Sequence, residues 1–514
     1  MTARHREESA QTTPISLVSL GGEQIDQLGI NNIGDLQAVV PNLNLDPFPA
    51  NNQTLRLFIR GIGLSDVQIT QDPAVGVYLN GVYIARSTGL AFDLPDLERI
   101  EVLRGAQGTL YGRNTTGGAI NLITRKPDLE TLSLRQDVSA GNLGLKRTRT
   151  SLNLPLGQYV AAKLAYLDDR RDGFIDNDGP GGNFGDRNSS GARVDLRVLP
   201  GDNVTLDYAW DRSRIEYFNY TPQAHYPAPL RGGLIDLIGL SASRFVPYSE
   251  QRLDALSTSV PLLPTDIDVE GHTLSVEYLP GDFTLRSLTA WRQLDELSYI
   301  DFASGASGEY RVDFNAATLS AEAPEPLQLP AVRPLISHEQ WSQELQWLGP
   351  IGERMDFLAG LYYFEERASE FNAPEHHLFS APLGQTRYPA VVNIRQELND
   401  IDNSAAAAYG QLNWTPDVLR QRLNLGLGLR YSRDRRRVDR NVSERTLIDN
   451  GDSNEQLIPG VVFSASGDRT FEDVSVTFSM GYDWRDNLHA YAKYVEAYRS
   501  GGYNVRDPDP VTFA

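Results

Sequence analysis

The stretch RGAQGTLYGRNTTGG, residues 104–118, contains five glycines and is the part of the sequence most like a ligand-binding loop. Glycine-rich loops can hold phosphate through backbone N–H groups, but a P-loop also needs Lys-Ser or Lys-Thr after its last glycine. Here Gly112 is followed by Arg113 and Asn114. The dinucleotide spacing Gly-x-Gly-x-x-Gly does not occur in this stretch either, and a strand pattern follows it instead of a helix. We therefore interpret these glycines as tight turns between close-packed strands.

Two other segments contain residue types that bind metals. The segment DNDGPGGNFGD, residues 176–186, has acidic residues spaced as in a calcium loop, but Phe174 and Gly185 occupy two ligand positions. The segment EHH, residues 375–377, has two adjacent histidines and no obvious third ligand. Both are better interpreted as surface loops. The sequence has no cysteine and no Ser-His-Asp order, so it predicts no metal site, no cofactor and no catalytic centre, and we expect a protein that is not an enzyme.

The composition limits the possible partners. The 514-residue chain has a formal net charge of −20 and a sequence pI of about 4.8, which argues against nucleic-acid binding. Mean hydropathy is −0.36, and no apolar run approaches the ~18 residues of a membrane helix. The polar start MTARHREESAQTTP has no apolar signal-peptide core. Either the protein stays in the cytoplasm, or the sequence does not begin where its precursor begins.

The first 127 residues are predicted to form a mixed α/β domain. Asn80-Gly81 favours a type I′ turn between two strands, because both residues tolerate positive φ. Asn32 is a plausible N-cap for a short helix that Pro41 ends. The expected elements are strands at 15–20, 99–105 and 119–125, a short helix at 32–41 and a hairpin at 73–86.

From about residue 129 onward the sequence alternates with a period of two. In VSVTFSMGYDW, residues 474–484, every second residue is apolar, and WSQELQW, residues 341–347, follows the same pattern with one interruption. Short turns alternate with long polar stretches at roughly 214–268, 297–337, 371–401 and 435–468. A soluble β-sandwich would also alternate, but the asymmetry of the connections favours a transmembrane antiparallel β-barrel. We count roughly thirteen strands within residues 128–514.

Several long motifs resemble those of TonB-dependent outer-membrane receptors. The resemblance covers essentially the whole chain, and its text includes TTPISLVSLGGEQI (12–25), IRGIG (59–63), DPAVGVYLNGVYIAR (72–86), DLPDLERIEVLRGAQGTLYGRNTTGGAINLITRKP (93–127), SQELQW (342–347) and YVEAYRSGGYN (494–504). It implies an N-terminal plug domain, residues 1–127, inside a β-barrel formed by residues 128–514.

The resemblance also implies a function and partners. Such receptors import scarce nutrients across the Gram-negative outer membrane, using TonB and its inner-membrane energising complex. The expected ligand is a ferric siderophore or another iron complex, and the expected surroundings are outer-membrane lipid. Vitamin B12, haem and oligosaccharides are alternative cargoes, and a sensory transducer has the same fold. A passive porin or adhesin is a further alternative, against which the plug motifs argue.

Residue roles follow from the same resemblance. Arg60 and Arg104 match plug arginines that lock onto barrel glutamates, and the expected partners are Glu344, whose parity places it on the lumen side, and Glu496. The alternative is that both arginines only bind local turn carbonyls. Plug loops 64–72 and 86–92 should face the exterior; the expected ligand-facing residues are Asp66, Gln68, Arg86 and Ser87.

The sequence also departs from the family pattern. Only Thr2-Ala3-Arg4 remain of the expected TonB box. Roughly thirteen strands are fewer than the ~22 of a barrel that encloses a plug, and an odd number leaves an unpaired edge, which a bilayer does not tolerate. We therefore expect a sequence that is truncated at both ends.

Overall fold

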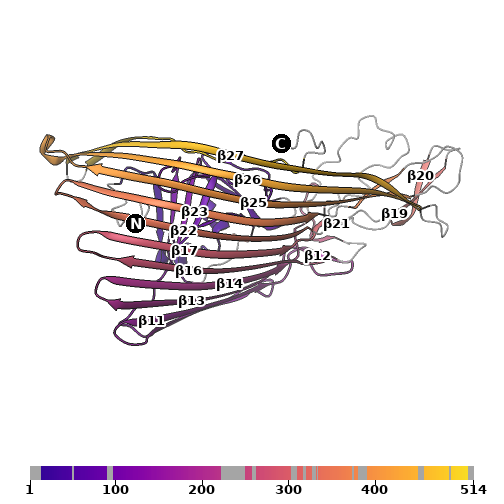
Figure 1. Cartoon of the computed structure of the whole chain (residues 1–514). Helices are drawn as coiled ribbons and strands as arrows, with labels where there is room; N and C mark the ends of the chain where they lie inside the picture. Colours follow the sequence, from indigo (N-terminus) through magenta and orange to yellow (C-terminus); the bar gives the residue numbers. More distant parts are fainter. Residues whose placement is uncertain are drawn as a thin grey trace.

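The computed structural model describes residues 13–48, 51–88, 96–220, 249–256, 262–301, 310–315, 320–326, 331–332, 334–372, 375–379, 390–449, 456–485 and 488–506. Most of these residues form one large curved antiparallel sheet, with a smaller N-terminal domain against its inner side (Figure 1). Within the described residues, no helix has the length and apolar character needed to cross a membrane.

The curved sheet has thirteen strands in one continuous order, as the alternation predicted, and the short strand β24(Glu375–Phe379) pairs beside β25. Neighbouring strands are antiparallel throughout, and the order ends at β9 and β28. The strands are β9(Ser133–Ala140), β10(Lys146–Pro155), β11(Val160–Arg171), β13(Arg187–Gly201), β14(Val204–Tyr217), β16(Thr265–Tyr278), β17(Thr284–Leu297), β22(Leu335–Ile351), β23(Met355–Asn372), β25(Ala390–Trp414), β26(Leu423–Asp449), β27(Gln456–Arg485) and β28(Leu488–Val495).

Two long strands correct the sequence-based interpretation of 435–468 as a loop. β26 continues to Asp449 and β27 begins at Gln456, so most of this stretch is strand. The reason is visible in RDRRR, residues 433–437: Asp434 and Arg436 are buried on the inner face, whereas the three other arginines are exposed on the outer face. Because both faces carry charges there, the strand has no apolar alternation.

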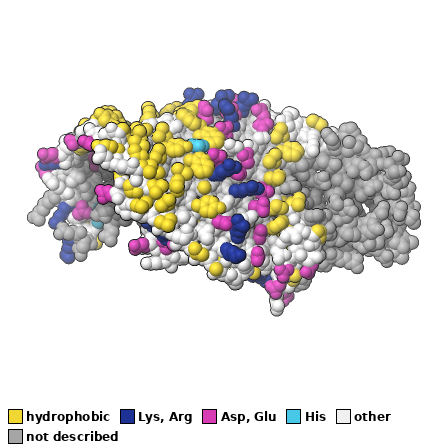
Figure 2. All heavy atoms as spheres, turned by 90° about the horizontal axis from the view of Figure 1, so that it is seen from below, with side chains coloured by type: hydrophobic (Ala, Val, Ile, Leu, Met, Phe, Trp, Pro, Cys, Tyr) yellow, Lys and Arg dark blue, Asp and Glu magenta, His cyan; other side chains and the backbone are white. Residues whose placement is uncertain are grey.

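The outer face of the sheet is apolar over a broad region. On β22, Trp341, Leu345 and Trp347 are 38%, 48% and 51% exposed, whereas Glu344 between them is buried. Figure 2 shows this apolar surface with a row of charged side chains beside it. An apolar outside and a polar inside are typical of a membrane-spanning barrel wall and opposite to a soluble sandwich.

The N-terminal domain contains a five-stranded sheet in the order β1-β7-β8-β5-β6 and a three-stranded sheet in the order β2-β3-β4. Its apolar core includes Leu36, Ile59, Val75 and Ile120, all less than 1% exposed. Its elements are β1(Leu17–Gly21), α1(Gly22–Gln27), the 3-10 helix η1(Ile33–Ala38), β2(Leu43–Phe48), β3(Asn51–Ile59), β4(Ile62–Gly63), β5(Val75–Leu79), β6(Val82–Ile84), β7(Leu97–Arg104) and β8(Gly118–Thr124).

The hairpin turn and the helix start predicted in this domain are confirmed, but the helix expected over 32–41 is the 3-10 helix η1, which ends at Ala38 and not at Pro41. Asn80 and Gly81 have φ of 51° and 86° and join β5 to β6, as a type I′ turn requires. The backbone N–H of Asn32 donates to the Asp35 carboxylate at 3.1 Å, which fixes the start of η1. The predicted boundary at 127/128 lies in the connection between β8 and β9.

Asn80 has a second role that gives a testable prediction. Its side-chain oxygen accepts from the Thr124 N–H at 3.0 Å, and its side-chain nitrogen donates to the Thr124 hydroxyl at 2.9 Å. Asn80→Gly keeps the positive φ but removes both bonds, so we expect the domain to lose about 1 kcal/mol of unfolding free energy. Urea unfolding in detergent measures this. A loss below about 0.3 kcal/mol would show that the bonds contribute little beyond those to water.

Candidate functional site

The candidate site is the contact between the N-terminal domain and the inner face of the curved sheet. Gln340 of β22 binds the end of β6, with its side-chain oxygen accepting from the Ala85 N–H at 3.1 Å and its nitrogen donating to the Tyr83 carbonyl at 2.7 Å. Thr109 lies on the loop between β7 and β8, and its buried hydroxyl is 2.6 Å from the hydroxyl of Thr477 on β27. Both contacts join the domain directly to the sheet.

The glycine-rich loop between β7 and β8 lies in this contact. A Cβ atom on Gly108 would lie 2.3 Å from the Glu496 carbonyl oxygen, and one on Gly112 would lie 2.6 Å from a guanidinium nitrogen of Arg430. Gly112 also has φ of 85°. The loop therefore needs glycine for close approach to the sheet and for a left-handed turn.

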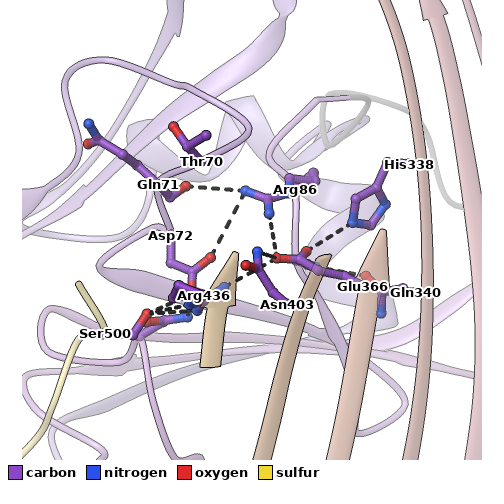
Figure 3. A network of polar contacts seen from close by, with 12 residues as sticks. Thr70, Gln71, Asp72, Arg86, His338, Gln340, Glu366, Asn403, Arg436 and Ser500 are labelled. Atoms are coloured by element: carbon purple, nitrogen blue, oxygen red, sulfur yellow. Dashed lines mark hydrogen bonds and ion pairs between the residues drawn. The ribbon is translucent and has the colours of Figure 1, made fainter. Parts of the chain in front are cut away.

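Six charged residues meet in the middle of the contact, and we call them the seam cluster. Figure 3 labels Asp72, Arg86, Glu366 and Arg436 among them. One Asp72 carboxylate oxygen accepts from Arg113 and Asn114, both at 2.6 Å, and from Arg436 of β26. The Ser500 hydroxyl donates to the same oxygen at 3.2 Å and accepts from Arg436. The seam cluster consists of Asp72, Arg86 and Arg113 from the N-terminal domain and Glu366, Asp434 and Arg436 from the sheet.

Glu366 of β23 is the sheet's main acceptor. It receives Arg86 at 2.6 Å, Asn403 at 2.7 Å and Arg436 at 3.3 Å on one oxygen. Its second oxygen lies 3.1 Å from His338 Nε2. Glu366 is 1% exposed and Arg86 is 9% exposed, so this ion pair is largely shielded from water.

The charges of the seam cluster balance. The three guanidinium groups face three carboxylates, and the Arg113 Nε atom lies 3.3 Å from the Asp434 carboxylate. Arg113 also lies over the Phe364 ring, 4.8 Å from its centroid. Buried ion pairs add little net stability over apolar packing, but removing one partner leaves an uncompensated charge. Such a contact fixes the position of the domain on the sheet, and its stability falls strongly when one of the six charged residues is removed.

The pKa values of the domain's charged residues keep them ionised. Burial alone would raise the pKa of the Asp72 carboxyl, but Arg436 and Arg113 outweigh burial and hold that pKa below its ordinary value. Burial alone would lower the pKa of Arg86, whereas Glu366 and Asp72 raise it, with a net increase. Both residues therefore stay charged near neutral pH.

This sets the pH dependence of the contact. Because the pKa of Asp72 is lower in the folded state, its stabilisation is present above the ordinary carboxyl pKa and is lost as the pH falls through the folded pKa. We expect the N-terminal domain to loosen only below about pH 4. Urea unfolding of the wild type and of Asp72→Asn between pH 3 and 7 measures how much Asp72 stabilises the domain at each pH. The difference between the two should shrink on acidification, and a constant difference would contradict the assignment.

The structure places Arg60 and Arg104 away from the sheet glutamates, which corrects the expected lock. Arg60 donates to the Ser16 hydroxyl at 3.1 Å, and Arg104 donates to the Pro41 carbonyl at 3.4 Å. Both partners belong to the N-terminal domain, but neither is the local turn carbonyl of the alternative: Ser16 offers a hydroxyl, and Pro41 is 63 positions from Arg104. The physical reason is position: Arg60 is an exposed left-handed turn residue with φ of 54°, and Arg104 ends β7 beside Ser16.

The two expected glutamate partners lie in different surroundings. Glu344 is 8% exposed on the inner face, as its parity predicted, and accepts from the Tyr409 hydroxyl. Glu496 accepts from the Tyr494 hydroxyl at 2.7 Å and from the Val476 N–H at 3.3 Å. Neither is paired with Arg60 or Arg104 among the described contacts.

The four residues expected to face the ligand also lie in different surroundings. Asp66 is half-buried and lies 3.3 Å from Arg506, and Gln68 donates to Asp66 at 2.7 Å. Arg86 and Ser87 are only 9% and 8% exposed, and Arg86 belongs to the seam cluster. The expectation for Arg86 is therefore corrected, because its guanidinium group points to the sheet instead of the exterior.

The remaining residues and segments considered in the sequence add no binding site to this contact. Thr2, Ala3 and Arg4 lie outside the described residues, as do the side chains of 375–377. In the segment 176–186, the side chains of Asp176 and Asn183 bind each other at 3.0 Å. Within the described part of the chain, no group of three His, Asp or Glu side chains is placed to hold a metal ion.

Sequence reasoning missed five of the six members of the seam cluster, which are Asp72, Arg113, Glu366, Asp434 and Arg436. One signal was available: in RDRRR, Asp434 and Arg436 are two residues apart, so a strand must place them on one face. The pairing with Asp72 connects residues 364 positions apart and has no local signature.

The comparisons with known proteins agree with this architecture. The TonB-dependent Receptor Plug Domain model matches residues 9–119, and the TonB dependent receptor-like beta-barrel model matches residues 207–510. The Pesticin receptor of Yersinia enterocolitica is 24% identical over 520 residues, which cover 98% of this chain and 63% of that receptor. The Vitamin B12 transporter BtuB of Vibrio cholerae is 26% identical over 215 residues, 41% of this chain and 33% of that protein.

Two solved structures have the same fold. The ferric yersiniabactin uptake receptor FyuA from Yersinia pestis superimposes with a TM-score of 0.74 at 22% identity, covering 99% of this chain and 68% of that one. The Ferric-Catecholate import receptor Fiu from E. coli K12 gives a TM-score of 0.61 at 16% identity, covering 96% and 71%. The chain thus spans about 63% of the length of the curated pesticin receptors that it matches.

Proposed function

The chain belongs to the family of TonB-dependent receptors, and from this premise we propose that it takes up a ferric siderophore or another iron complex across the outer membrane of a Gram-negative bacterium. We assign residues 1–127 to the plug and residues 128–514 to the barrel. TonB and its inner-membrane energising complex are the proposed energy source, with Thr2-Ala3-Arg4 as part of the segment that TonB binds. We assign no covalent chemistry to the chain.

The seam cluster is the observation that supports this proposal best. A plug that moves during transport needs a contact that holds at rest and separates as a unit when pulled. A balanced set of three guanidinium groups and three carboxylates has this property, because it is specific in geometry but adds little net stability. We therefore propose that the lock lies at the seam cluster and not at Arg60 and Arg104.

The relatives support an iron complex as the cargo. FyuA is a ferric yersiniabactin uptake receptor and Fiu is a ferric-catecholate import receptor, and both align over nearly all of this chain. The match to a vitamin B12 transporter covers 41% of the chain. We therefore favour an iron complex over vitamin B12.

Gene deletion in the host bacterium tests the function. We expect iron-limited cells that lack the gene to lose accumulation of at least one ⁵⁵Fe-siderophore complex, and cells that lack TonB to lose the same accumulation. Complementation with the intact gene should restore it. Unchanged uptake of every iron complex, together with lost uptake of ⁵⁷Co-labelled vitamin B12, would replace iron by vitamin B12 as the cargo.

A further inference from the structure

On the inner face of the sheet, the same three residue types occur twice as neighbours across β23, β25 and β26, at two positions along these strands. The lower row consists of Glu366 on β23, Asn403 on β25 and Arg436 on β26, which are direct cross-strand partners. The upper row consists of Glu370, Asn399 and Arg440, which are partners in the same way on the same three strands. Each upper residue is four positions from its lower counterpart, or about 13 Å along the strands.

The lower row is filled by the N-terminal domain. Arg86 donates to Glu366 at 2.6 Å, and the Asp72 carboxylate accepts from Arg436. The domain thus offers a cation to the glutamate and an anion to the arginine, with Arg86 Nη1 4.0 Å from the Asp72 carboxylate. Asn403 completes the row by donating to Glu366 at 2.7 Å.

In the upper row the arginine's partner comes from the sheet itself, because Arg440 donates to Glu397 of β25 at 2.9 Å. Asn399 is 1% exposed, yet neither its side-chain oxygen nor its side-chain nitrogen has a hydrogen-bond partner among the described residues. Its counterpart Asn403 does. A buried amide without partners costs about 1–3 kcal/mol unless something binds it. Asn399 is therefore an independent sign that this row accepts a polar ligand.

A layer of apolar side chains separates the two rows. Ala368, Ile401 and Val438 lie between them on the same strands and pack with Ile69 of the N-terminal domain and with Tyr503. This layer keeps the lower row away from the exterior while the domain is in place. A ligand that enters from the side of the long connections meets the upper row first.

We propose that Glu370, Asn399 and Arg440 form a binding station for a ligand that carries a carboxylate or similar anionic oxygen beside an N–H donor, and that the lower row is a second station of the same chemistry. Asp72 and Arg86 occupy the second station at rest. This inference rests on the proposed function and names the polar groups that the iron complex presents. Two equivalent weak stations allow a ligand to bind and still move on.

Binding of two matched ⁵⁵Fe complexes to outer-membrane vesicles of the host tests the proposal without TonB. Desferrioxamine B ends in an ammonium group, and its N-succinyl derivative ends in an amide N–H and a carboxylate. We expect the succinyl complex to bind at least about fivefold more tightly, and Asn399→Leu with Arg440→Met to abolish this preference. Glu370→Gln, which keeps the side-chain size, should reduce it.

Outward-facing residues of β26 provide the control. Asn441 and Arg437 are exposed, so Asn441→Leu with Arg437→Met should keep the preference. Equal affinity for the two complexes, binding of neither, or a preference that survives in the Asn399 and Arg440 variant would overturn the proposal. Lost iron uptake on gene deletion combined with any of these results would leave the proposed function standing, whereas unchanged uptake would contradict the function itself.

Discussion

Glu366→Gln is expected to weaken the attachment of the N-terminal domain by about 3–5 kcal/mol. The substitution keeps the size of the side chain but removes the negative charge that Arg86, Asn403, His338 and Arg436 share. Arg86 would stay 9% exposed, with its next carboxylate, Asp72, 4.0 Å away. A fluorophore on Glu23→Cys, an exposed position in a chain without native cysteine, would follow urea unfolding of the domain.

Two comparisons separate the buried charge from general effects. Glu365→Gln changes the neighbouring residue on the exposed outer face and should alter stability by less than about 0.5 kcal/mol. Adding Arg86→Met to Glu366→Gln removes the stranded cation and should recover much of the loss. If the double variant is as unstable as the sum of the single ones, the two residues are not coupled and the seam cluster is wrongly assigned.

Gly108→Ala is expected to cost about 1–3 kcal/mol, because the new Cβ has no room. It would lie 2.3 Å from the Glu496 carbonyl oxygen and 2.7 Å from the Ala497 Cα, and both are backbone atoms that cannot rotate away. Gly108 has no positive φ, so the effect would report the approach of the loop to the segment that follows β28 and not backbone strain.

Gly410→Ala is the matched control for this prediction. The nearest atom to a Cβ there is the Leu358 carbonyl oxygen at 3.5 Å, an ordinary contact. Urea unfolding with the same fluorophore should find this variant close to wild type. Equal stability of the Gly108 and Gly410 variants would mean that the loop tolerates displacement and that its glycines serve only the turns.

The sequence predicts the parts of this structure that depend on local rules. Asn80-Gly81 specifies its turn through positive φ, and the alternation around Glu344 correctly places that residue inside and Leu345 outside. Thirteen strands follow from the same period. These features need only neighbours in the chain.

The charged contacts could not be predicted in the same way. Arg60 and Arg104 match family arginines, but neighbouring groups of their own domain bind them. Arg86 and Glu366 meet across 280 positions, and nothing near either residue indicates the other. In RDRRR, strand geometry places Asp434 and Arg436 on the buried face and the three other arginines on the exposed face.

The account depends most on movement of the N-terminal domain away from the sheet during uptake, and a reversible cross-link tests this directly. The Thr109 and Thr477 hydroxyls are 2.6 Å apart across the contact, and the chain has no cysteine of its own. In cells with Thr109→Cys and Thr477→Cys, ⁵⁵Fe-siderophore uptake should stop when the disulfide forms and return after reduction, whereas each single variant should transport throughout. Uptake at the wild-type rate by the fully cross-linked receptor would contradict the account.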